Sequence, residues 1–186
     1  MKNVDKNTWD EEVSKDTRWV WVVEFYAPWC PHCKAFKDEF EKVAKNLDGI
    51  VRVAAVNCEK EKALCQAARV ESYPTIKAVV GGTPADYRGA RTATALSKWG
   101  ISAIPDHVRA VRTASELQQL YAECLKADWH ICVLFMSSKS DPSAQARTLA
   151  YRFGSQIFVM EAKTSQARMR GRGSLVTLRD GGGEGF

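Results

Sequence analysis

The sequence predicts an α/β fold built from two successive units. Short runs of valine and aromatic residues, typical of buried strands, alternate with segments in which apolar residues recur every three or four positions, as on one face of a helix. The alternation occupies residues 1–104 and resumes over 105–186, after Ile104-Pro105-Asp106. A chain of 186 residues can bury roughly 70% of its unfolded surface, so it can fold without disulfide support.

The first unit is expected to begin with a buried strand over residues 19–27. A helix follows the next turn, because Phe36, Phe40, Val43 and Leu47 recur at helical spacing before Asp48-Gly49. The remaining elements are expected as a strand over 50–57, a helix over 60–69, a strand over 74–80, a strand over 86–88 after Gly81-Gly82, and a helix over 92–99.

The second unit is expected to repeat this order and to stop early. Its elements are predicted as a helix over 115–126, a strand over 131–136, a helix over 142–152, and strands over 156–160 and 175–179. The chain then reaches Gly181-Gly182-Gly183, where a hairpin should turn, so the unit lacks its last strand and helix.

Charge and hydropathy argue against nucleic-acid and membrane partners. The net charge of +5 comes from 27 basic and 22 acidic residues, and the only basic cluster, over residues 163–172, has no interleaved aromatic residues and reads as solvated surface. No apolar run approaches the 18 residues of a membrane span. The first residues, MKNVDKNTWDEEV, lack the apolar core of a signal peptide.

The six cysteines fall into three close pairs, and one pair has the spacing of redox chemistry. Cys30-Pro31-His32-Cys33 lies between the first predicted strand and helix, where the free N–H groups of the helix N-terminus favour a thiolate. An ordinary thiol is only about 3% ionised at pH 7. His32 adds a nearby hydrogen-bond donor that favours the thiolate as well. A zinc site would need a second cysteine or histidine pair at matching spacing, which is absent, so redox chemistry without a metal or organic cofactor is favoured over zinc binding or a structural disulfide.

Three motifs together resemble a known family. EFYAPWCPHCK is followed about 40 residues later by SYPTIK and then by YRGART. This order resembles a catalytic domain of the protein disulfide isomerase family, over roughly residues 3–104. The resemblance implies a thioredoxin fold, in which a central mixed sheet is flanked by helices.

The resemblance also implies roles for individual residues. Cys30 would be the attacking thiol and Cys33 the resolving thiol. Arg91 matches an arginine that lowers the pKa of the resolving cysteine, although by sequence alone it reads as a surface residue. Pro74 matches a proline with a cis peptide bond. The residues implied in substrate binding are Trp29, Pro31, Tyr73 and Pro74.

Glu24 lies between Val23 and Phe25 in an otherwise apolar strand. Burial would raise the pKa of its carboxyl by desolvation, and a carboxyl beneath Cys33 could then exchange a proton with that thiol. The alternative is an exposed position on an edge strand. Many relatives pair this acid with a lysine on the next strand, but the matching residue here is Ala55.

Pro31 stands where most isomerases have glycine. The Pro-His pair resembles a bacterial disulfide oxidase, in which the reduced thiolate form is stabilised and the disulfide is a stronger oxidant. We therefore expect this domain to favour donation of disulfides.

The other two cysteine pairs are interpreted as structural. Relatives carry non-catalytic disulfides at places similar to Cys58 with Cys65 and Cys124 with Cys132, although buried free thiols remain an alternative for the former pair. Three oxidised pairs would indicate the endoplasmic reticulum lumen or another secretory compartment. The second unit has no CxxC motif, and Gly173-Ser174 occupies the place of the cis proline, so it reads as a redox-inactive thioredoxin-like domain.

The sequence thus predicts a thiol–disulfide oxidoreductase of the protein disulfide isomerase type. Its partners would be unfolded or disulfide-containing proteins, with glutathione or another oxidoreductase as the redox donor. Three alternatives remain: a cytosolic thioredoxin-like reductase, a chaperone or adaptor for which peptide binding matters more than exchange, and the first part of a sulfhydryl oxidase.

Overall fold

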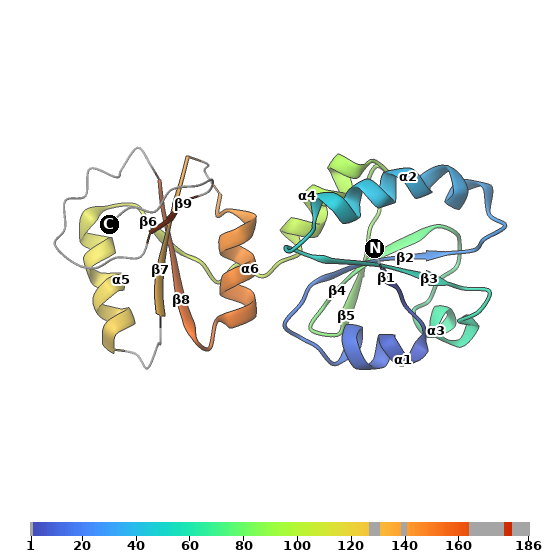
Figure 1. Ribbon diagram of the computed structural model, residues 1–186, viewed down its shortest axis with the longest axis horizontal. Coiled ribbons are helices and arrows are strands. Elements are labelled where there is room, and N and C mark those ends of the chain that lie inside the picture. The colour runs from blue at the N-terminus through green and yellow to red at the C-terminus, as the bar shows by residue number, and fades with distance from the viewer. Residues whose placement is uncertain (1, 127–130, 139–140, 164–176, 180–186) are drawn as a thin grey trace. The chain divides into compact units, whose positions relative to one another are not determined.

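The structure is a computed structural model that describes residues 2–126, 131–138, 141–163 and 177–179. It divides into two compact units, Met1–Ile104 and Pro105–Phe186. Figure 1 shows each unit as a sheet with helices on both faces. The predicted α/β fold is confirmed, and the first unit has the expected mixed sheet flanked by helices.

The first unit is built on a five-stranded sheet of order β1-β3-β2-β4-β5. Strands β1 and β2 run parallel to β3, whereas β4 runs antiparallel to both β2 and β5. The strands are β1 (Lys2–Asn3), β2 (Trp21–Tyr26), β3 (Arg52–Asn57), β4 (Thr75–Val80) and β5 (Thr83–Asp86). The central strands β2, β3 and β4 are buried over most of their length, as expected for strands covered on both faces.

Helices cover both faces of this sheet. Figure 1 shows α2 and α4 on one face and α1 and α3 on the other. The helices are α1 (Lys6–Thr8), a π-helix (Trp9–Ser14), α2 (Pro31–Asn46), α3 (Lys62–Ala67) and α4 (Ala93–Ser102). Phe40 and Val43 are fully buried on α2, which confirms the apolar stripe predicted for that helix.

The second unit holds a four-stranded sheet of order β6-β8-β7-β9. Its elements are β6 (Arg109–Val111), α5 (Ala114–Lys126), β7 (Ile131–Ser137), α6 (Ala144–Phe153), β8 (Ile157–Lys163) and β9 (Thr177–Arg179). Strand β9 runs parallel to β7, whereas the first unit has an antiparallel β4 beside β2. The predictions about Gly173-Ser174 and Gly181-Gly182-Gly183 lie outside the described residues.

Some predicted elements were wrong or missed. The strand predicted over 86–88 is Thr83–Asp86 instead, and it lies at the sheet edge with every residue exposed. The segment has no alternation of apolar and polar residues, so only its pairing with β4 determines its position. Pro84 is tolerated because an edge strand need not donate backbone hydrogen bonds on its outer side. The elements before residue 15 and β6 were also missed, because segments of two to six residues are too short to show a clear periodicity.

Candidate active site

Cys30 and Cys33 lie at the junction of β2 and α2. Cys30 is the N-cap residue of α2, with extended backbone, and Pro31 occupies the first helical position. Proline suits that position because its ring presets the helical φ angle and its missing N–H would have had no helical partner. Both cysteines are free and 5% exposed. The local sequence therefore aims the first turn of the helix at the Cys30 sulfur.

The protein shifts the pKa values of the two thiols in opposite directions. The backbone N–H of Cys33 is the main cause that lowers the pKa of Cys30, with smaller contributions from the Cys33 thiol, the His32 N–H and the charge of Arg91. Burial raises the pKa of Cys33 to about 11. A dithiol with one acidic and one basic sulfur separates an attacking thiolate from a thiol that must first lose its proton.

Glu24 lies on β2 and is 5% exposed. Burial raises the pKa of its carboxyl to about 7, against the opposing charge of Arg91, and the charge of Glu24 in turn contributes to the raised pKa of Cys33. The alternative of an exposed edge position is wrong, because β2 is the central strand of the sheet. A carboxyl that titrates near neutral pH beside a buried thiol can accept and return a proton.

Lys77 is a second buried ionisable residue in the sheet of the first unit, on the strand next to that of Glu24 but not among the predicted site residues. Glu24 pairs with Ala55 on β3 and with Ile76 on β4. Because side chains alternate between faces along a strand, Lys77 lies on the face opposite to Glu24. Its ammonium instead forms an ion pair with Asp86 of β5. In the sequence, Lys77 is noticeable only as a lysine within the apolar segment TIKAVV. The face of the sheet on which its side chain lies follows only from the register of β4 against β2.

Tyr73 and Pro74 bring the β4 end of the sheet to the dithiol. The Tyr73–Pro74 peptide bond is cis, and the Cys30 thiol donates to the Tyr73 carbonyl at 3.6 Å. Trp29 is 60% exposed, and its ring meets that of Tyr73 edge to face at a centroid distance of 6.1 Å. An exposed aromatic surface thus borders the buried sulfur, as suits contact with a polypeptide.

Arg91 is exposed, and its Nη2 donates to the Pro74 carbonyl at 3.1 Å. Its charge acts on both Glu24 and Cys30. The imidazole of His32 lies on the exposed side of α2. Six of the predicted residues therefore lie around the two cysteines: Glu24, Trp29, Pro31, Tyr73, Pro74 and Arg91. His32 differs from the expectation, because it stabilises the Cys30 thiolate through its backbone N–H.

The other four cysteines form two disulfides. Cys58 is bonded to Cys65, and Cys124 to Cys132. The first bond lies in the core beneath α3, and Cys124 lies in the core of the second unit. No group of three or more metal-binding side chains gathers within the part of the chain that the structure describes. No helix among those residues is long and apolar enough to cross a membrane.

Comparison with known proteins identifies the family. The Thioredoxin family model matches residues 1–102. The chain is 41% identical over 108 residues to the protein disulfide-isomerase A6 homolog of Drosophila melanogaster, covering 56% of this chain and 24% of the relative. It is 35% identical over 153 residues to protein disulfide isomerase-like 2-3 of Oryza sativa, covering 77% of this chain and 33% of the relative. The chain thus spans at most about a third of the length of these two relatives.

Solved structures support the fold over more of the chain. Crystal form II of ERdj5 matches with a TM-score of 0.65 at 20% identity, covering 89% of this chain and 22% of that one. At this identity the likeness concerns the fold alone. The chain therefore belongs to the thioredoxin family, and the relatives that it resembles within that family include proteins named protein disulfide isomerases.

Proposed function

We propose that this chain exchanges disulfides with substrate proteins through Cys30 and Cys33. The Cys30 thiolate attacks one sulfur of a substrate disulfide, that S–S bond breaks, and the other substrate sulfur leaves as a thiolate. Cys33, after losing its proton to the Glu24 carboxylate, attacks Cys30 in the mixed disulfide. The substrate leaves as a dithiol with two electrons, and Cys30 and Cys33 are left as a disulfide. The reverse sequence oxidises a substrate.

The observation that carries this proposal is the asymmetry of the dithiol. The N–H groups of the first turn of α2 lower the pKa of Cys30, while burial raises that of Cys33 to about 11. The sulfur that is readily ionised is thus the one beside Tyr73 and Pro74, where a substrate strand can lie. The Cys33 sulfur is the one influenced by the charge of Glu24, the one acid in β2.

The direction of exchange follows from the stability of the reduced form. Because Pro31 presets the first turn of α2, the N–H groups of His32 and Cys33 already face the Cys30 sulfur. Stabilising that thiolate stabilises the dithiol and makes the disulfide form more oxidising. We infer that net flow favours oxidation or isomerisation, with glutathione or another oxidoreductase exchanging electrons with the site. The compartment we infer is the endoplasmic reticulum lumen or another part of the secretory pathway, supported by the two structural disulfides.

The second unit is proposed to be a redox-inactive thioredoxin-like domain over residues 105–186. Its helix α6 follows a central strand as α2 follows β2, but the N-cap residue is Ser143 in place of a cysteine. The buried carboxylate of Glu161 accepts from the Ser143 N–H, at 2.9 Å and 3.1 Å to its two oxygens. The N-terminus of α6 thus binds a carboxylate of its own domain, whereas the equivalent end of α2 in the first unit stabilises the Cys30 thiolate. This unit would bind or space substrates without exchanging disulfides.

Insulin reduction and the refolding of scrambled ribonuclease test the proposal. The Cys30→Ser variant should lose both activities, while Cys33→Ser should form mixed disulfides that persist. The double variant Cys124→Ser/Cys132→Ser is the control, and it should keep the rate of exchange at Cys30. Aggregation suppression that survives Cys30→Ser, beside weak exchange by the unmodified chain, would instead support a chaperone.

A further inference from the structure

A groove lies on the β4–β5 side of the first unit and includes Pro74, the proline of the cis peptide bond. It has a volume of about 840 Å³, and its walls come from the end of α3, the start of β4, strand β5 and the segment that follows it. We call it the arginine groove, after Arg69, Arg88 and Arg91. Pro74 lies in its wall, one residue from the Tyr73 carbonyl that contacts the Cys30 sulfur. A polypeptide that is joined to Cys30 and runs past Tyr73 and Pro74 would therefore enter the groove.

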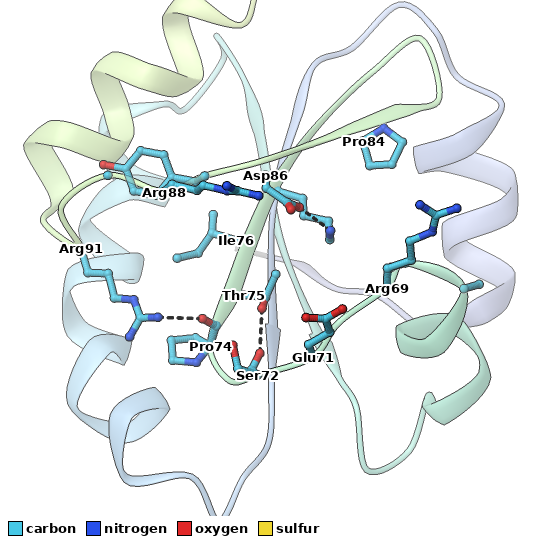
Figure 2. A pocket seen from close by; sticks show the side chains of 15 residues that line it. Arg69, Glu71, Ser72, Pro74, Thr75, Ile76, Pro84, Asp86, Arg88 and Arg91 are labelled. Carbon is cyan, nitrogen blue, oxygen red and sulfur yellow. Dashed lines mark hydrogen bonds and ion pairs between the residues drawn. The ribbon is translucent and has the colours of Figure 1, made fainter.

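The charges of the arginine groove are unbalanced. Lys77 and Asp86 neutralise each other as an ion pair, which leaves three arginines against Glu71. No ion pair to any of the three arginines occurs among the described residues, and all three are exposed. Figure 2 shows Arg69 and Glu71 on one side of the groove and Arg88 and Arg91 on the other. The lining thus carries a net charge of two positive units.

Arg69 stands at a backbone position that favours glycine. Its φ angle is +53°, and it follows the C-cap of α3, where the Arg69 and Val70 N–H groups donate to the Gln66 and Cys65 carbonyls. Glycine is the usual residue at this point of such a helix end, because it adopts the left-handed conformation without a steric cost. An arginine here places a guanidinium at the groove wall despite that cost, and strained residues of this kind gather at functional sites.

We propose that the arginine groove binds the part of a substrate protein next to its reacting cysteine and selects acidic residues there. The inference rests on the proposed function, since the substrate reaches the groove only when its cysteine is at Cys30. Guanidinium groups form paired hydrogen bonds with carboxylates, and two walls that both carry arginine can hold acidic side chains from either face of an extended segment. The lone Glu71 would repel the same segment and limit how tightly it binds.

The test measures mixed-disulfide formation at Cys30 in the full chain carrying Cys33→Ser. The probes are peptides of equal length whose single cysteine is activated with a neutral 2-thiopyridyl group. Glutamate, glutamine or lysine occupies the flanking positions. Release of thiopyridone gives the second-order rate. The glutamate peptide should react about tenfold faster than the glutamine peptide at low salt, and the lysine peptide should be slowest. The difference should largely vanish near 0.5 M salt, where charges are screened within about one contact distance.

Two double variants separate the groove from net charge. Arg69→Gln/Arg88→Gln, which leaves only Arg91 of the three arginines, should remove most of the rate difference between the glutamate and glutamine peptides by slowing the glutamate peptide. Lys45→Gln/Lys98→Gln removes the same charge from exposed positions on α2 and α4, and it should preserve most of the selectivity. Equal effects of the two double variants, or equal rates for all peptides, would overturn the groove proposal. If neutral dithiodipyridine also failed to react at Cys30, the proposed exchange activity itself would be wrong.

Discussion

Glu24→Gln should make the first unit more stable at neutral pH and a poorer catalyst. Burial raises the pKa of Glu24 from 4.5 to about 7, a difference worth about 3 kcal/mol at 1.36 kcal/mol per unit. Below pH 4.5 the carboxyl is protonated in both the folded and the unfolded chain, so it imposes no cost. Between pH 4.5 and 7 only the unfolded chain releases the proton, and the folded state loses up to about 3 kcal/mol relative to the unfolded state. Glutamine lacks this loss.

Urea unfolding, followed by tryptophan fluorescence from pH 4 to pH 8, measures the difference. The stability of Glu24→Gln minus that of the unmodified chain should rise by about 3 kcal/mol between pH 4.5 and 7 and then level off. Glu41→Gln, which replaces an exposed acid on α2, is the matched control and should show no such rise. A flat difference for Glu24→Gln would refute the assignment of a buried, titrating carboxyl.

The same substitution should slow resolution of the mixed disulfide. With a pKa of about 11 instead of 9.0, Cys33 holds about a hundredfold less thiolate near pH 7 than an ordinary thiol. Proton transfer to Glu24 offsets this deficit, so its loss should slow the release of substrate by up to about a hundredfold, within the usual range for general-base catalysis. The attack by Cys30 should keep its rate. Stopped-flow measurement of both steps checks this, and unchanged resolution would exclude Glu24 as the proton acceptor.

Three further changes probe the remaining features. Pro31→Gly should lower the reduction potential of the dithiol by about 30 mV, a tenfold change in a glutathione titration, and an unchanged or higher value would contradict the role given to the first turn of α2. Cys58→Ser/Cys65→Ser should destabilise the first unit by about 2.5 kcal/mol, the loop-closure value for eight residues, as measured by urea unfolding; full stability would mean that the bond is not formed. Glu161→Ala leaves the buried Ser143 N–H without its acceptor and should reduce stability by about 2 kcal/mol. Hydrogen exchange in α6 would then report roughly thirtyfold faster opening. Unaltered exchange would contradict a capping role for Glu161.

The reactive part of the site was predictable because it is local. Cys30, Pro31 and Cys33 lie within one helical turn, so a strand followed by an apolar stripe already places one sulfur at a helix N-terminus. Glu24 was predictable for a similar reason, since an acid between apolar neighbours in a strand is either buried or on an edge. Only the sheet order decided between these, because it makes β2 the central strand.

Contacts between distant segments required the tertiary structure. The sequence by itself determined the chemistry of the Cys30 and Cys33 pair, since spacing and a helix start suffice for it. The register of β4 decided that Lys77 faces away from Glu24 and binds Asp86, and packing decided that Glu161 caps a helix 18 residues before it. The arginine groove likewise draws its charges from segments about 20 residues apart. No sequence pattern joins such residues, because strand pairing and side-chain direction are set by the folded sheet as a whole.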